Sequence, residues 1–501
     1  MAQPPLDSNR LFEQVFSHVS RYAVDSLNDD DLYRRAAEGL LSELPDPYSA
    51  LLVGSERSTL TEQTSGNYVG IGVQVDLRGG TIMVVSAYPD SPADRAGIRT
   101  GDRIVEVDGT LVSASDLGET ARLLRGEPGS KVVVRVRRAG VDGLLSFEVT
   151  RAEVHRRAAS AGILYEGGVG YVALSRVAER SAEELHHVID SLRGIGMQSL
   201  VLDLRGNPGG LLEEGVAVAE LFLDPGVSIL ETRGRTTSVQ QRYVDQQPQP
   251  WANLPLVLLV NEGTASAAEI IAGALQDHDR ALVVGQPTYG KGLVQSVFGL
   301  EQGASLRLTT GRWYTPSGRT IQRPDRGAGP VNGVAMVPSD TVPEFRTPAG
   351  RVIKGGGGIV PDVVVQRDSL PPEERAFLEG LGSRLPSYRN AITTLALRVR
   401  ERGTVTSADF VITPALRAEL VANLEEAGIH LDAAALRGGA GVLDRALGYE
   451  IARYSLGRPA ELRRRSRYDR QLQAAFTALR AAPSRFALLG LPEPSAPGNE
   501  R

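Results

Sequence analysis

A serine and a lysine, 25 residues apart, are the side chains of this sequence best placed for covalent chemistry. Ser266 opens a predicted helix over 266–275. The start of a helix offers free N–H groups and a partial positive charge, which would stabilise an oxyanion forming beside the serine. Ser266 and Glu269 also fit the S-x-x-E capping box, in which the hydroxyl only terminates the helix. The two roles compete for one hydroxyl.

The lysine stands out because lysine is rare in this chain. Of 55 basic residues, only Lys131, Lys291 and Lys354 are lysine, although an arginine-rich composition explains that scarcity without any function. Lys291 lies between two glycines, and a buried lysine can lose its proton whereas arginine stays charged. To act as a base near pH 7, its pKa must fall by roughly 3 units, which requires a dry site without a salt-bridged carboxylate. Gln295 can orient the neutral amine by hydrogen bonding.

A histidine base for Ser266 is disfavoured. His278 is the histidine nearest in sequence, 12 residues downstream. A helix of ten residues is about 15 Å long, so His278 could not reach the serine at its start. The sequence has no G-x-S-x-G elbow around Ser266. A serine–lysine dyad is the remaining route.

A glycine- and proline-rich turn, residues 206–210, is the third candidate element. It follows a predicted buried strand, 200–204, and precedes a helix that starts near Leu211. Its backbone amides suit an oxyanion hole, but a tight strand-to-helix turn with no chemistry is an equally natural explanation. It is not a P-loop, because no G-K-[ST] follows the glycines.

These segments need a scaffold, and the chain changes character three times along its length. The first 66 residues are predicted to be helical, residues 67–153 form a β-rich unit, and residues 154–366 show a mixed α/β pattern. Strands 200–204 and 255–260 are almost wholly apolar, as in a sheet covered on both faces. Residues 367–501 are predicted to be helical, with segments over 371–381, 387–402, 414–427, 441–456 and 469–480.

Bulk composition excludes some classes of function. The 501 residues carry a net charge of -5, which gives no support for binding nucleic acid or an anionic membrane. There is no cysteine for disulfides, thiol catalysis or cysteine metal sites, and no apolar run approaches the ~18 residues of a membrane span. The short polar start, residues 1–5, suits a mature terminus given a new initiator methionine, a hypothesis that a gene without an upstream leader would contradict.

The ordered motifs closely resemble those of the carboxyl-terminal processing (tail-specific) serine proteases over about residues 10–365. Segments 203–210, 264–269 and 290–295 match the strand-turn, nucleophile and base motifs of that family, with its spacing from serine to lysine. Segments 313–319 and 358–362 resemble two further signatures. Ala268 stands where a second serine is common, a departure that leaves Ser266 untouched.

The resemblance implies a role for each site residue. Ser266 would be the nucleophile, Lys291 the general base and Gln295 its orienting partner, with no metal or cofactor. The oxyanion hole would use the backbone N–H of Ala267 and of a glycine in the turn. That glycine would be Gly209 or Gly210. Residues 67–153 would be a PDZ domain whose carboxylate-binding loop is Gly70, Ile71, Gly72 and Val73.

The fold that the resemblance implies is a multidomain α/β protein. A crotonase-like core of ββα units, residues 154–366, would carry the inserted PDZ domain, with a helical segment (1–66) before it and a helical extension (367–501) after it. Family members commonly form homo-oligomers and act in the bacterial cell envelope or periplasm, although this chain shows no export signal. The C-terminal extension has three open roles: oligomerisation, binding of an adaptor protein, or restriction of access to the site.

The function expected is therefore a serine endopeptidase that recognises the apolar C-terminal tails of proteins through its PDZ domain. One alternative is a latent or inactive PDZ scaffold that needs a partner, against which the intact dyad and Gln295 argue. Another is an acyl-CoA enzyme on the same fold, in which a PDZ domain would have no evident purpose. An assay that compares turnover of a peptide with turnover of an acyl-CoA distinguishes the acyl-CoA enzyme from the other two functions.

Overall fold

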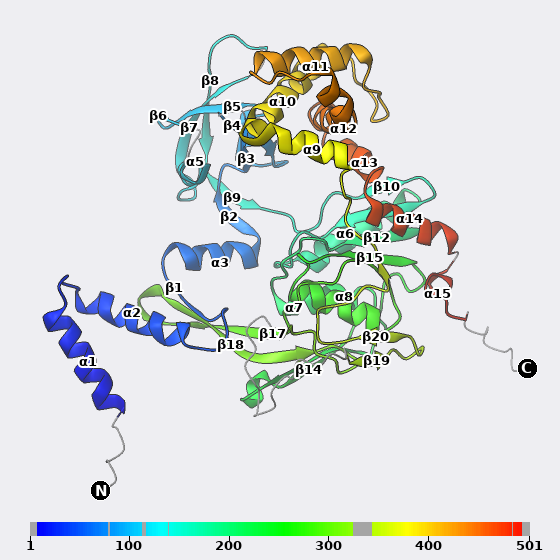
Figure 1. The fold of residues 1–501 in the computed structure, drawn as a ribbon. Coiled ribbons are helices and arrows are strands. Elements are labelled where there is room, and N and C mark those ends of the chain that lie inside the picture. Colours follow the sequence, from blue (N-terminus) through cyan, green and yellow to red (C-terminus); the bar gives the residue numbers. More distant parts are fainter. Residues whose placement is uncertain are drawn as a thin grey trace, which may run out of the picture.

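Two sheets of a central α/β domain hold the Ser266 and Lys291 segments (Figure 1). The computed structural model describes residues 8–78, 81–112, 117–138, 140–323, 343–482 and 484–492. The polar start, residues 1–5, lies outside these ranges. The first sheet runs in the order β10-β11-β12-β15-β16-β21 and is parallel from β11 onward. Its strands are β10 (Ile163–Tyr165), β11 (Val169–Ala173), β12 (Ser199–Asp203), β15 (Leu256–Val260), β16 (Leu282–Gly285) and β21 (Val363–Val364).

The second sheet is antiparallel and runs in the order β1-β18-β13-β14, with β17 paired to β18. Its strands are β1 (Ala50–Leu52), β13 (Ser228–Gly234), β14 (Gln241–Val244), β17 (Leu293–Gly299) and β18 (Ser305–Tyr314). A small hairpin of β19 (Glu344–Arg346) and β20 (Val352–Lys354) lies nearby (Figure 1). Lys291 therefore lies just before the start of β17, whereas Ser266 follows β15 of the first sheet.

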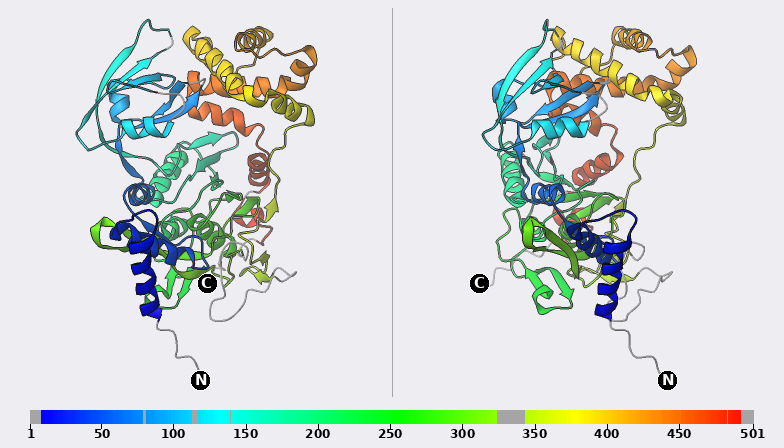
Figure 2. Two further views of the ribbon diagram at one scale, coloured as in Figure 1. Left: turned by 60° about the vertical axis from the view of Figure 1, so that its left-hand side comes forward. Right: turned by 90° about the vertical axis from the view of Figure 1, so that its left-hand side faces the viewer.

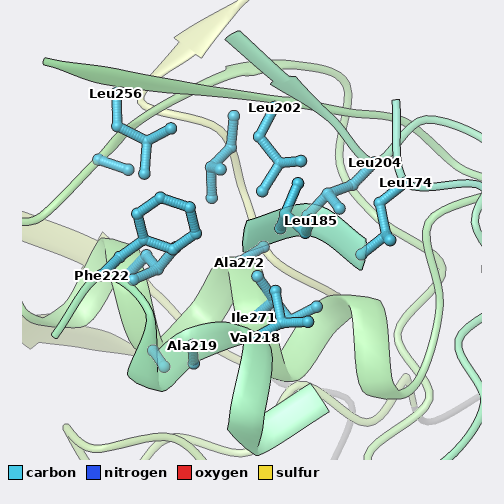
Figure 3. Close-up of a cluster of buried hydrophobic side chains, with 14 of the residues drawn as sticks. Leu174, Leu185, Leu202, Leu204, Val218, Ala219, Phe222, Leu256, Ile271 and Ala272 are labelled. Carbon is cyan, nitrogen blue, oxygen red and sulfur yellow. The ribbon is translucent and has the colours of Figure 1, made fainter. Parts of the chain in front are cut away.

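The parallel sheet is covered on both faces, as its apolar strands predict. Every residue of β12 and β15 is buried. On one face, Leu202 and Leu256 point toward Ile271 (Figure 3) and pack with the helices α6 (Ser181–Gly194), α7 (Leu212–Glu220) and α8 (Ala267–Asp277). The alternate residues, including Val201 and Leu259, pack on the other face against a C-terminal helix, α14 (Arg470–Ala481). Alternation along each strand thus fills two cores at once.

The β-rich unit is a separate sheet with its own core. The sheet runs β3-β4-β5-β7-β8, with β6 paired to β5. A pairing of β2 with β9 joins this unit to the rest of the chain. Its elements are β2 (Asn67–Gly70), β3 (Val73–Arg78), β4 (Thr81–Ala87), α4 (Pro92–Ala96), β5 (Arg103–Val107), β6 (Thr110–Leu111), α5 (Leu117–Leu124), β7 (Lys131–Arg137), β8 (Leu145–Thr150) and β9 (Ala152–His155).

The N-terminal segment is not wholly helical, contrary to expectation. Helices α1 (Ser8–Tyr22), α2 (Asp29–Ser42) and α3 (Ser55–Ser65) form, but β1 lies between α2 and α3 and pairs with β18. The strand forms because the edge of the second sheet offers backbone partners, a tertiary effect that local patterns do not show. The figures show α1 standing away from the domains (Figures 1 and 2), and its apolar residues Leu11, Phe12 and Val15 are about half exposed.

The C-terminal extension is helical, as predicted. It comprises α9 (Pro372–Leu381), α10 (Leu385–Arg402), α11 (Pro414–Glu426), α12 (Ala433–Leu456), α13 (Arg458–Ser466), α14 and α15 (Arg485–Leu488). Helix α12 starts eight residues before the predicted 441–456, so the glycines at its beginning lie inside it. A Cβ atom on Gly439 would lie 2.6 Å from the ring of Phe377 in α9. The glycines therefore allow close helix packing that outweighs their low helix propensity. None of the helices described is long and apolar enough to cross a membrane.

Candidate active site

Ser266 lies on a strained turn between β15 and α8. Its backbone has φ 54° and ψ -120°, a conformation that L-residues other than glycine rarely adopt. Thr264 fixes the turn, because its hydroxyl donates to the carbonyl of Leu204 at 2.8 Å and accepts from the N–H of Asn261 at 3.0 Å. Helix α8 is buried along its whole length. The position of Ser266 is thus fixed by its attachment to a fully buried helix.

Glu269 connects the serine segment to the lysine segment. Its carboxylate accepts hydrogen bonds from the backbone N–H of Ser266 (2.8 Å), Gly290 (2.7 Å) and Lys291 (2.9 Å), and from the hydroxyl of Thr288. The bond from the Ser266 N–H is the one expected of a capping box. The side chain is fully buried, and burial raises its pKa although these donors favour the charged form. Sequence reasoning assigned Glu269 only to the cap and missed its bonds to 290 and 291.

Lys291 has the environment of a base. Burial, followed by the charge of Arg307, lowers the pKa of its amine to about 8. The amine donates to Gln295 Oε1 at 2.8 Å and lies 4.6 Å from the centre of the Tyr48 ring. Gln295 in turn donates to the Tyr48 carbonyl at 3.1 Å. Sequence reasoning paired Lys291 with Gln295 but missed Tyr48 and Arg307, which only tertiary folding brings near.

The two reactive side chains line one cavity of about 830 Å³. Within the part of the chain that the structure describes, no hydrogen bond joins the Ser266 hydroxyl to the Lys291 amine, which donates to Gln295 instead. The backbones around both residues are linked through Glu269. Ser266 and Lys291 therefore share one cleft, and no hydrogen bond is made between the serine hydroxyl and the lysine amine.

The turn at 206–210 lies against the serine. A Cβ atom on Gly209 would lie 2.9 Å from that of Ser266 and 2.8 Å from the Ala267 nitrogen. The Gly209 N–H donates to the Asn207 side chain at 2.9 Å. Within the described residues, the N–H groups of Gly210 and Ala267 donate to no protein acceptor. Of the two glycines considered, Gly210 is the one whose N–H is available for an oxyanion.

A second cavity, of about 310 Å³, lies between helix α3 and the β-rich unit, where β3 and α5 line it. Ile71, Gly72 and Val73 line it, while Gly70 ends the preceding strand β2. Arg156 and Arg176 line both this cavity and the cleft that holds Ser266. Burial and the charge of Arg156 lower the pKa of Arg176 to about 10. Three of the four residues predicted as a carboxylate-binding loop thus line this cavity, together with two arginines that also line the cleft.

Comparison with known proteins identifies the two units. Residues 168–330 match peptidase family S41, and residues 83–138 match a PDZ domain. The carboxy-terminal-processing protease of Bartonella bacilliformis is 35% identical over 315 residues, covering 62% of this chain and 72% of that protein. The carboxy-terminal processing protease CtpA of Bacillus subtilis is 34% identical over 315 residues, covering 63% and 66%.

A solved structure of the photosystem II D1 C-terminal processing protease is 27% identical to this chain. It aligns with 72% of this chain and 94% of that one, at a TM-score of 0.38. The sequence-based expectation of a serine-type peptidase with a PDZ domain is confirmed by the family matches. The chain belongs to the carboxy-terminal processing proteases of peptidase family S41.

Proposed function

We propose that the chain is a serine endopeptidase in which Ser266 is the nucleophile and Lys291 the general base, oriented by Gln295. The lowered pKa of the Lys291 amine, in the same cavity as Ser266, carries the proposal. With a pKa of about 8, roughly a tenth of the molecules hold a neutral amine at pH 7. At the ordinary lysine pKa that share would be about one in 2,500.

The reaction would proceed through an acyl-enzyme. The Ser266 oxygen bonds to the carbon of the scissile carbonyl as its proton passes to the Lys291 amine. The carbonyl oxygen becomes an oxyanion between the N–H groups of Ala267 and Gly210. The carbon–nitrogen bond then breaks as Lys291 returns the proton to the leaving amine, and water releases the acyl group by the same steps. The Gly209 N–H is already used by Asn207, so it serves the turn itself.

Substrates would be proteins with exposed, apolar C-terminal tails. In a PDZ domain, consecutive backbone amides receive a terminal carboxylate while the tail adds as a strand beside the sheet. The cavity between β3 and α5 has apolar walls that include Val73, Val75 and Leu124, which supports an apolar final residue. Arg156 and Arg176, lining both cavities, support a negatively charged end. The PDZ domain would extend over 67–153 and the protease core over 154–366.

The test is degradation of an unstructured protein with an apolar C-terminus. We expect Ser266→Ala and Lys291→Ala each to abolish cleavage while far-ultraviolet circular dichroism and melting temperature stay close to wild type. Lys354→Ala, which changes an exposed lysine, is the matched control and should leave the rate unchanged. Amidation of the substrate's C-terminus should raise KM. Retained cleavage in either dyad variant would contradict the proposed mechanism.

A latent form is the second candidate, favoured by the unmade hydrogen bond between Ser266 and Lys291. In this form the PDZ domain or the C-terminal helices would keep the dyad apart until substrate or a partner binds. A free peptide with an apolar C-terminus, added in trans, should then stimulate cleavage of an unrelated unstructured substrate. If the rate responds neither to such a peptide nor to deletion of the PDZ domain, the enzyme is constitutively active and the latent form is excluded.

The proposal extends to assembly and location. The exposed apolar face of α1 supports a homo-oligomer formed through this helix, since a large exposed apolar surface marks an interaction site. An adaptor protein is the alternative occupant of that face. Light scattering of the purified chain separates them, because the pure protein would remain a monomer if only an adaptor binds. The family supports action in the bacterial cell envelope or periplasm, which fractionation of the source cells would test.

A further inference from the structure

The C-terminal extension contacts both the PDZ domain and the protease core (Figure 1). Met83 of the PDZ domain packs among α9–α12, and Arg400 in α10 donates to the Thr100 carbonyl at 2.8 Å. Helix α14 lies on the parallel sheet, where Leu472 and Phe476 are buried against strand residues. The extension is therefore an integral part of the folded chain, although neither family model reaches it.

The start of α14 reaches the strand that leads into the oxyanion turn. Asp469, the N-cap residue of α14, forms an ion pair with Arg205 at 2.8 Å and also accepts from the Leu472 N–H at 3.0 Å. Gln471 accepts a further hydrogen bond from Arg205 at 3.0 Å. The Arg205 guanidinium thus receives two acceptors from a helix that lies 264 residues further along the chain.

Arg205 is held on its other side by the end of β12. It donates to Asp203 at 2.9 Å, and the Asp203 carboxylate also accepts from the Tyr171 hydroxyl at 2.9 Å. Burial disfavours the charge on Arg205, but the carboxylates of Asp203 and Asp469 outweigh burial and raise its pKa. The cation is therefore fixed between two carboxylates, one from the core and one from the C-terminal extension. With Asp469 removed, a mostly buried charge would lose one of its two carboxylate partners.

The residue after Arg205 begins the oxyanion turn. The Gly206 N–H donates to Asn261 at 2.8 Å, and the Asn207 carbonyl accepts from the Ala265 N–H at 2.9 Å, so the turn is tied directly to the serine segment. A change in the direction of Arg205 would therefore be transmitted to the spacing between the Gly210 and Ala267 N–H groups. Displacements of about 1 Å in a catalytic constellation can cost roughly 100-fold in rate.

We propose that Asp469, assisted by Gln471, is a positioning residue for the oxyanion hole, acting through Arg205 on the 206–210 turn. The C-terminal extension then contributes directly to the geometry of catalysis, in addition to covering the sheet. The inference rests on the proposed function, because it assumes that the 206–210 turn stabilises an oxyanion. It assigns a role to a part of the chain that the family resemblance does not cover.

The experiment compares Asp469→Asn with Asp368→Asn in the full-length protein. Asparagine keeps the N-cap of α14 but removes the charge that holds Arg205. Asp368 accepts from the Arg470 N–H at the same helix end, at 3.0 Å, and within the described residues it makes no hydrogen bond or ion pair with Arg205, so it is the matched control. We expect Asp469→Asn to lower kcat about 10-fold with KM within about 2-fold, a partial loss of an oxyanion donor. Gln471→Leu should lower kcat less, and Asp368→Asn should leave it unchanged.

Two further measurements distinguish the positioning role of Asp469 from a general loss of rigidity in the protein. In Asp469→Asn, the midpoint of the rise of kcat with pH should stay near pH 8, because the surroundings of Lys291 are unchanged. Amide hydrogen exchange should quicken at residues 204–210 and not along α14. Equal effects of Asp469→Asn and Asp368→Asn, or unchanged exchange in the turn, would overturn the inference. If wild type shows no Ser266-dependent cleavage, the proposed function fails, while the exchange measurement still decides whether Asp469 sets the turn.

Discussion

The two sides of the catalytic cleft are built in different ways. The Ser266 side belongs to the interior, because α8 is fully buried and the strained turn is tied to its neighbours by the Thr264 hydroxyl and by backbone hydrogen bonds. The Lys291 side lies at the start of β17, and its amine contacts Gln295, which lines the cleft, and the ring of Tyr48. The position of Ser266, the proposed nucleophile, is fixed by the core. The position of the Lys291 amine, the proposed base, depends on Gln295 and on the segment that carries Tyr48.

Glu269 bonds to both sides of the cleft. It accepts from the N–H of Ser266 and from that of Lys291, so the distance between the two backbones is fixed even though the reactive atoms are not bonded to each other. Formation of the proposed dyad would then need a rearrangement of side chains alone, in which the Lys291 amine leaves Gln295 for the Ser266 hydroxyl. This division would allow substrate to complete the site without a change in the core.

Glu269→Gln should have the largest effect, because it disturbs both sides. Glutamine offers one acceptor oxygen, and its NH2 group would face N–H donors that the carboxylate now satisfies. We expect activity to fall at least about 100-fold and the free energy of unfolding to drop by about 2–4 kcal/mol. Activity assays with chemical denaturation measure both. Glu262→Gln, at an exposed acid paired with Arg367, is the control, and similar losses there would remove the special role of Glu269.

Gln295→Glu tests the base side alone. A carboxylate in place of the amide would form an ion pair with the Lys291 amine and raise its pKa by about 1–3 units. In the proposed mechanism the neutral amine is the base, so the midpoint of the rise of kcat with pH should move from near 8 to higher pH. Activity at pH 7.5 should fall about 10- to 100-fold and recover partly at pH 9.5. If the lost activity does not recover at high pH, Gln295 acts on Lys291 through its shape and not through the pKa of the amine.

The two sides also differ in how far they can be predicted from sequence. The helix predicted over 266–275 is α8 (Ala267–Asp277), and the strand predicted over 255–260 is β15, because apolar runs bounded by turn residues determine these buried elements. The proximity of Tyr48 and Arg307 to Lys291 depends on the pairing of β1 and β17 with β18, and no local pattern encodes it. The choice of Gly210 over Gly209 also required the structure, since it depends on one hydrogen bond from Gly209 to Asn207.

Arg307→Gln should raise the pKa of Lys291, as Gln295→Glu does, but by a smaller amount. Burial is the main cause of the lowered pKa of Lys291, and the positive charge of Arg307 adds to it. Removal of that charge lets the pKa rise, so the rise of kcat with pH should shift upward by about half a unit, with roughly a 2- to 3-fold loss at pH 7.5. Arg233→Gln, at an exposed arginine paired with Glu231, is the matched control. A downward shift would contradict this account of the pKa.

Loss of the apolar face of α1 should have the smallest effect on catalysis. The loop that holds Tyr48 is anchored within the chain, because Asp46 accepts from the Thr309 hydroxyl at 2.8 Å and β1 pairs with β18. Phe12→Ser with Val15→Ser should therefore dissociate the proposed oligomer, seen by light scattering, while kcat changes less than about 2-fold. Leu11→Ile, which keeps the face apolar, should preserve the oligomer. If kcat instead falls when the oligomer dissociates, a second copy of the chain helps to hold the Lys291 side of the cleft. The proposed base would then depend on the assembly, whereas the proposed nucleophile depends only on the core of its own chain.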